Sequence, residues 1–137
     1  SLSGEGTGGL VQMAVRGIRG AITVDANEEN KILGATAELL EGIVKLNNIR
    51  PEDVACAFLT VTRDLDAAFP ALAVRRMPGW DLVPLMCAQE VPVKGSLERC
   101  IRLMLLVNTP LGQTEIRHLY LGEARKLRPD LAGNNPS

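Results

Sequence analysis

Charged side chains that could bind a small anion are the most informative chemical groups in this sequence. Arg19 lies beside Gly20, and Arg102 lies within an otherwise apolar run. Burying a guanidinium costs free energy unless an anion accompanies it, and a substrate carboxylate would supply that anion in bidentate geometry. Glu90 is a candidate partner for an arginine, or an acceptor for a hydrogen bond from a substrate hydroxyl. These residues predict recognition of a small carboxylate.

The sequence lacks the motifs of nucleophilic, metal-dependent and nucleotide-dependent enzymes. His118 is the only histidine, so no histidine cluster can hold a metal, and we expect this side chain to be structural and hydrogen-bonded to backbone. The GxSxG, HExxH and phosphate-binding glycine-loop patterns are missing. Gly17 and Gly20 do not have the spacing of a dinucleotide fingerprint. We therefore expect neither a metal nor a cofactor.

Composition and charge narrow the classes of partner and compartment. The 137 residues include 15 Lys plus Arg and 16 Asp plus Glu, so the net charge of −1 gives no basic field for nucleic acid or a membrane surface. Cys56, Cys87 and Cys100 are far apart and form no CxxC pair, which favours a reducing, cytoplasmic setting over a disulfide framework. No apolar run reaches the ~18 residues of a membrane span, and the N-terminus does not have the pattern of a signal peptide.

We expect one domain, at residues 13–131, between two tails. Residues 1–12 are rich in Gly and Ser without periodicity, which is typical of a flexible tail or a cloning remnant. Residues 132–137 form a second polar tail. Hydrophobic residues make up 46% of the chain but aromatic residues only 3%, so the core must be built from Leu, Val, Ile, Ala and Met.

Five short segments have the length and residue types of β-strands. The run from Cys100 to Asn108 is nearly continuously apolar, which favours a central strand. Pro84 favours an edge position for its own strand, because proline cannot donate to a ladder. The predicted strands are Val15–Val24, Ala55–Thr62, Val83–Cys87, Cys100–Asn108 and Ile116–Leu121.

One long helix is predicted within Glu28–Asn47, where apolar residues recur at helical spacing. Asp25 followed by Glu28 has the spacing of a capping box at its start. Shorter helical pieces are expected at Pro51–Asp53 and within Leu65–Met77. The fold class is therefore α+β, a mixed five-stranded sheet with the long helix on one face. One helix cannot cover such a sheet, so we expect oligomerisation to bury the remaining apolar surface.

Six short groups of residues follow one another through the domain. They are Arg16-Gly17-Ile18-Arg19-Gly20-Ala21 with Thr23-Val24; Phe69-Pro70-Ala71 with Ala73-Val74-Arg75; Gly79-Trp80, Val83-Pro84, Cys87 and Gln89-Glu90; Cys100-Ile101-Arg102; Ile116-Arg117-His118 with Tyr120-Leu121; and Leu127-Arg128-Pro129-Asp130-Leu131. In this order and spacing the chain resembles the monofunctional chorismate mutases of the AroH class. The resemblance runs from Val15 to Leu131, nearly the whole chain outside the tails.

The resemblance implies an architecture and a reaction. It implies a homotrimer in a pseudo-α/β-barrel arrangement, with active sites in clefts between adjacent subunits. It also implies conversion of chorismate to prephenate, a Claisen rearrangement in the shikimate pathway of aromatic amino acid biosynthesis. That reaction needs no nucleophile, metal or proton transfer, which agrees with the catalytic motifs that the sequence lacks.

The resemblance further implies roles for five catalytic residues. Arg102 is expected to stabilise the negative charge that develops on the ether oxygen of chorismate in the transition state. Arg19 is expected to grip a carboxylate and hold the substrate in its folded, reactive shape. Glu90 is expected to accept a hydrogen bond from the ring hydroxyl, with Cys87 beside it. Tyr120 is expected to contact a substrate carboxylate.

Further residues are expected, by the same resemblance, to border the substrate. Arg75 would lie near the cleft mouth, and Arg128 lies in a C-terminal segment that could fold over the cleft as a lid. Leu72 stands where some members of the family carry a lysine, so we expect a modest effect on substrate capture. The full set is Phe69, Ala71, Leu72, Arg75, Leu85, Met86, Leu127 and Arg128.

Three other functions fit part of the sequence. Trimeric enzymes of the imine-deaminase family also bind small carboxylates at subunit interfaces with an arginine, but the set of Arg102, Glu90 and Cys87 favours the mutase. A non-catalytic trimeric module that senses an aromatic-pathway metabolite would also need the arginines. A plain structural scaffold would leave Arg19 and Arg102 without partners.

Overall fold

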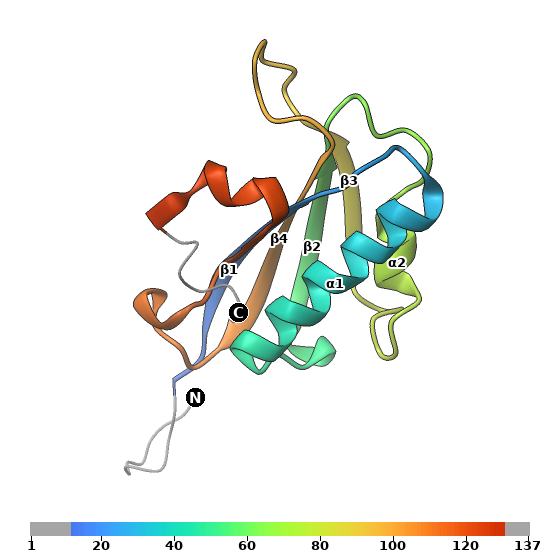
Figure 1. The fold of residues 1–137 in the computed structure, drawn as a ribbon. Coiled ribbons are helices and arrows are strands. Elements are labelled where there is room, and N and C mark those ends of the chain that lie inside the picture. Colours follow the sequence, from blue (N-terminus) through green and yellow to red (C-terminus); the bar gives the residue numbers. More distant parts are fainter. Residues whose placement is uncertain (1–11, 131–137) are drawn as a thin grey trace.

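A five-stranded mixed β-sheet with one long helix across it forms the centre of the computed structural model, which describes residues 12–130 (Figure 1). The sheet order is β3-β2-β4-β1-β5. Its strands are β1 (Ala14–Thr23), β2 (Val54–Val61), β3 (Leu85–Gln89), β4 (Cys100–Thr109) and β5 (Leu119–Leu121). The predicted α+β class and the five strands are confirmed, while the two expected tails lie almost wholly outside the described residues.

The central strand is β4, as its continuous apolar run predicted. It pairs antiparallel with β1 on one side and β2 on the other, and the outer strands β5 and β3 pair parallel with β1 and β2. Pro84 immediately precedes the edge strand β3, which agrees with the position expected for a proline.

The last strand is shorter than predicted, because it begins at Leu119 rather than Ile116. The backbone of Arg117 is engaged elsewhere: its N–H donates to Oδ1 of Asn47 at 2.8 Å, and its carbonyl accepts from Nδ2 of Asn47 at 2.9 Å. The side-chain amide of Asn47 therefore binds the backbone groups of Arg117 that would otherwise pair with a neighbouring strand.

Helix α1 (Glu29–Asn47) covers one face of the sheet and buries the main core. Gly20 of β1 lies under this helix, where an added Cβ would come within 2.5 Å of Ile43 Cδ1. The helix and β1 can therefore approach closely only because this residue has no side chain. The predicted capping box is wrong: Glu28 is itself the N-cap and makes no side-chain capping hydrogen bond, so Asp25 lies outside the cap.

Short helices complete the fold. The predicted pieces appear as η1 (Pro51–Asp53) and α2 (Ala71–Arg75), and the structure adds η2 (Gln113–Glu115) and η3 (Gly122–Leu127), where no helix was predicted. Helix η3 covers a second small core formed by Ala21, Cys100, Tyr120 and Ala124. Because Ala21 alternates with Gly20, this core lies on the sheet face opposite α1.

Candidate active site

The two arginines singled out from the sequence lie on the same open face of the sheet. In the β1–β4 ladder Arg19 is opposite Met104, and Arg102 is opposite Ala21. Residues opposite each other share a face, and Arg102 and Met104 are two apart in β4, so all four side chains point away from α1. Arg19 and Arg102 are diagonal neighbours, a relation that separates positions by about 7–8 Å.

Arg102 is not buried within β4, contrary to the sequence-based expectation. Its side chain is 47% exposed, because only the other face of the strand is covered by α1. The apolar neighbours Ile101 and Leu103 belong to that covered face. The alternation within one strand therefore separates an apolar core face from a face that presents a cation.

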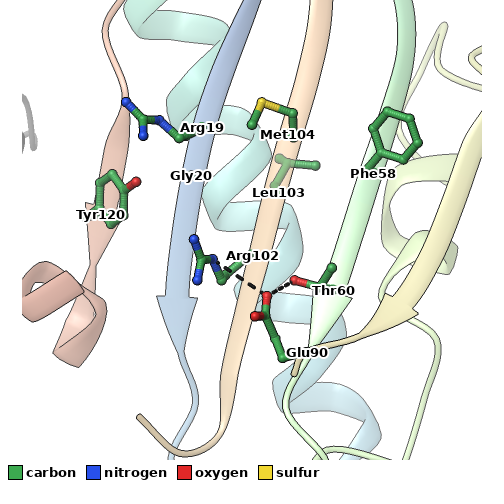
Figure 2. Close-up of a pocket in the computed structure, with 9 residues that line it drawn as sticks. All are labelled: Arg19, Gly20, Phe58, Thr60, Glu90, Arg102, Leu103, Met104 and Tyr120. Carbon is green, nitrogen blue, oxygen red and sulfur yellow. Dashed lines mark hydrogen bonds and ion pairs between the residues drawn. The ribbon is translucent and has the colours of Figure 1, made fainter. Parts of the chain in front are cut away.

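A cavity of about 270 Å³ lies over these residues (Figure 2). It brings together four of the five expected catalytic residues, while Cys87 lies outside it. The lining residues are Arg19, Gly20, Phe58, Thr60, Glu90, Arg102, Leu103, Met104 and Tyr120. Apolar and charged groups therefore meet in one concave site, which is typical of sites for small organic ligands.

Glu90 joins the cavity from the end of β3. Its backbone N–H donates to the carbonyl of Val61 at 2.8 Å, which continues the contact with β2 by one residue. Its Oε2 lies 3.6 Å from Arg102 Nε and also accepts a hydrogen bond from the Thr60 hydroxyl (Figure 2). Glu90 is thus an anionic partner of Arg102, one of the two roles considered for it from the sequence, and the guanidinium retains two further nitrogens as donors.

Tyr120 forms the opposite wall of the cavity. It belongs to β5, is opposite Ala21, and is 2% exposed as part of the second small core. Leu127 packs against the same core from η3. The parallel pairing with β1 and the packing of η3 together fix where the phenol lies.

The backbone of Arg19 is held by a histidine. Its N–H donates to Nδ1 of His118 at 3.0 Å, which confirms the structural role expected for that side chain. Burial, and then the positive charges of Arg19 and Arg128, lower the pKa of His118. The imidazole is therefore neutral near pH 7.

The remaining expected site residues do not line this cavity. Cys87 is opposite Leu59 and packs against the main core on the α1 side of the sheet. Arg128 is paired with Asp130 at 2.8 Å. Seven expected residues lie in α2, next to it or in β3: Phe69, Ala71, Leu72, Arg75, Leu85, Met86 and Cys87.

Some cavity residues were missed by the sequence analysis. Thr60 and Phe58 line the site from β2, and Met104 lines it from β4. Side chains that alternate along a strand share a face at every second residue, so Met104 shares the face of Arg102, and Phe58 shares the face of Thr60. Thr60 is opposite Arg102 in the β2–β4 ladder, which puts all of them on the open face. Within residues 12–130 no group of three or more His, Cys, Asp or Glu side chains is arranged to hold a metal, and no helix has the length and apolar character to cross a bilayer.

Known proteins are similar to this chain over most of its length. The family model for chorismate mutase type I matches residues 15–131. Chorismate mutase AroH of Bacillus subtilis is 50% identical over 120 residues, which cover 88% of this chain and 94% of that protein. Chorismate mutase AroH of Thermus thermophilus is 52% identical over 118 residues, which cover 85% and 96%.

A solved structure shows the same fold. The chorismate mutase from Clostridium thermocellum superposes with a TM-score of 0.79 at 45% identity, over 81% of this chain and 98% of that one. The motifs of the sequence, the sheet that positions Arg19 and Arg102, and these matches lead to one assignment: this chain belongs to the chorismate mutase type I family.

Proposed function

We propose that this chain is an isomerase that converts chorismate to prephenate in the cavity formed by Arg19, Glu90, Arg102 and Tyr120. The observation that carries the proposal is the pair of arginines on one open sheet face, with a carboxylate fixed at 3.6 Å from one of them. Chorismate is a dianion with a ring hydroxyl and an enolpyruvyl ether. Two cations, a phenol and a carboxylate acceptor match those groups.

The proposed mechanism is electrostatic. In the rearrangement the ether C–O bond breaks, a C–C bond forms, and the enol ether becomes a ketone within one molecule, so no proton or external group is consumed. Negative charge develops on the ether oxygen when bond breaking runs ahead of bond making. Arg102 then stabilises the transition state more than the ground state, which is the condition for acceleration.

The other groups restrain the substrate. Arg19 and Tyr120 bind carboxylates and hold the enolpyruvyl group over the ring, so the two reacting carbons stay close. Glu90 accepts a hydrogen bond from the ring hydroxyl, while Thr60 occupies one lone pair of the same carboxylate. No covalent intermediate, metal or cofactor takes part.

We also propose that the working enzyme is a cytoplasmic homotrimer of the pseudo-α/β-barrel type, with each site shared by two subunits. The side chains of Phe69 and Met86 are 72% and 63% exposed, and Phe58 is 40% exposed at the cavity itself. Exposed apolar groups of this size favour a subunit contact. The residues of α2 and β3 would then complete the cavity of a neighbouring subunit.

The activity is tested by following the ultraviolet absorbance of chorismate with purified protein and identifying the product. Decay with prephenate as product supports the mutase. A folded protein that leaves chorismate unchanged overturns it and favours an imine-deaminase-like enzyme or a metabolite sensor. A bicyclic transition-state mimic that binds far more tightly than prephenate would support catalysis, whereas equal binding favours a sensor.

Shared sites are tested by co-expressing two variants that are each expected to lose activity, Arg102→Ala and Arg75→Glu. The first removes the cation in the cavity, and the second places a negative charge at the proposed mouth, where it repels a dianion. Random mixing in a closed ring would restore about a quarter of the sites if the two residues come from different subunits. Activity no higher than that of either variant would refute sharing between these residues.

A further inference from the structure

The hydrogen bond between Arg19 and His118 occupies an unusual place in the sheet. The parallel ladder of β1 and β5 begins at the pair Gly20 and Leu119. One residue before this pair, in β1 and in the segment that leads into β5, the Arg19 N–H donates to the imidazole Nδ1 of His118 at 3.0 Å instead of to a backbone carbonyl. At Arg19, the residue proposed to bind a substrate carboxylate, the titratable side chain of His118 therefore replaces the backbone partner of the ladder.

His118 is itself held firmly in place. The preceding residue, Arg117, has both backbone groups bound by the side chain of Asn47 from the last turn of α1, at 2.8 and 2.9 Å. Asn47 is 7% exposed and also donates to the carbonyl of Ile43 at 3.0 Å. A chain of contacts thus leads from the helix C-terminus, through the segment before β5, to the backbone of Arg19.

We propose that His118 is a positioning residue for Arg19, and that its neutral imidazole holds the β1 backbone so that the guanidinium meets a substrate carboxylate. This inference rests on the proposed role of Arg19 in binding the substrate. The bond requires an unprotonated Nδ1, so the proton of the neutral ring must be on Nε2. Protonation of the ring places an N–H opposite the Arg19 N–H and breaks the bond.

The surroundings of His118 keep the ring neutral near pH 7. From β1, Arg16 and Arg19 line a second cavity, which His118 also lines, and Arg128 approaches from the segment after η3. The neutral Met104 of β4, Asn47 of α1 and Asn48 just after α1 also lie near it, while Glu115 and Arg117 border it from its own segment. Asp130 pairs with Arg128 at 2.8 Å, so four arginines and two carboxylates, those of Glu115 and Asp130, surround the ring.

Burial and the charges of Arg19 and Arg128 lower the pKa of His118 below its ordinary value. The protonated form therefore appears only in acid. As the pH falls through this lowered pKa, Arg19 loses its backbone partner, and kcat/KM for chorismate is expected to fall. A bound substrate carboxylate would offset the charge of Arg19, so the pKa of His118 should be higher in the complex.

The test compares His118→Asn with His118→Leu. The Oδ1 of asparagine is attached at the same place in the side chain as Nδ1, so it can accept the bond without titrating, whereas leucine offers no acceptor. Gln113→Leu is the matched control, because its side chain is exposed and uncharged and lines the same cavity as His118. Chorismate kinetics are measured for all three from pH 5 to 8, together with Arg19→Ala.

At pH 7.5 His118→Leu is expected to lose about tenfold in kcat/KM, the upper end for one hydrogen bond. The kcat/KM of His118→Asn should stay near the wild-type value at pH 7.5. In acid it should fall less than the wild-type value, because asparagine is not protonated there. A fully active His118→Leu, or an unchanged acid decline in His118→Asn, overturns the inference. If His118→Leu does not fold, the pH profile of His118→Asn decides alone. An active Arg19→Ala would instead overturn the proposed role of Arg19.

Discussion

Replacing Arg102 by alanine tests the electrostatic mechanism most directly. A unit charge 4 Å from a cation is stabilised by about 4 kcal/mol at an effective dielectric of 20, and by about 1 kcal/mol in water. If the ether oxygen carries about half a charge in the transition state, the Coulomb contribution is about 2 kcal/mol at a partly enclosed site. A hydrogen bond to a charged group adds about 1.5 kcal/mol.

These contributions sum to about 3.5 kcal/mol, so Arg102→Ala should lower kcat by about 10²–10³. The side chain is 47% exposed in the isolated chain, which makes water the main competitor for this stabilisation. A neighbouring subunit over the open face would exclude water and move the loss toward the upper value. Arg102→Lys should recover little, because an ammonium cannot reproduce the planar fork.

The assay is the decay of chorismate absorbance at saturating substrate, with folding checked by circular dichroism. Arg50→Ala is the control, since it removes an exposed arginine that pairs with Asp53 and Glu52 on the surface. Arg102→Ala with a kcat within about fivefold of wild type would refute the electrostatic role, because that corresponds to only about 1 kcal/mol.

Three other outcomes are expected. Glu90→Gln should fold normally and lose about tenfold in kcat/KM for chorismate, since a neutral amide accepts a weaker hydrogen bond; unchanged kinetics would remove Glu90 from the site. Gly20→Ala should lower the free energy of unfolding in urea by about 1–3 kcal/mol, because its Cβ meets Ile43 Cδ1. Gly34→Ala, whose Cβ meets nothing within 4 Å, should raise the free energy of unfolding by about 0.5–1 kcal/mol. Equal changes in the two variants would contradict the close approach of α1 to β1. Burial raises the pKa of Cys100 to about 11, so iodoacetamide at pH 8.5 should label it far more slowly in the folded than in the unfolded protein, as peptide mass spectrometry would show; similar rates would contradict its burial.

Much of the fold could be predicted because residue types alternate clearly. The helical spacing from Ile32 to Leu46 predicted α1, and the apolar run after Cys100 predicted the central strand. The short β5 could not be predicted, because the cause is the side chain of Asn47, distant in sequence, which binds the Arg117 backbone.

The candidate site was predicted less completely than the fold. An apolar run around Arg102 indicated burial, but only one face of β4 has a covering layer, and the run alone does not reveal that. The motifs placed Cys87 beside Glu90, and in sequence they are close. Cys87 lies in β3, and Glu90 follows three residues later, just after the strand. Because side chains alternate between the two faces of a sheet, these two point to opposite faces, and only Glu90 reaches this chain's cavity.

The diagonal placement of Arg19 and Arg102 on adjacent antiparallel strands has a consequence for how the protein can change. The separation of the two cations is fixed by the β1–β4 register, which runs without interruption from Ala14 paired with Thr109 to Thr23 paired with Cys100. Inserting one residue within either strand would turn one arginine toward α1, so changes in length must fall outside these strands, for instance at residues 91–98. The same rigidity means that the positive potential is already in place before the substrate arrives, and little reorganisation accompanies the movement of charge.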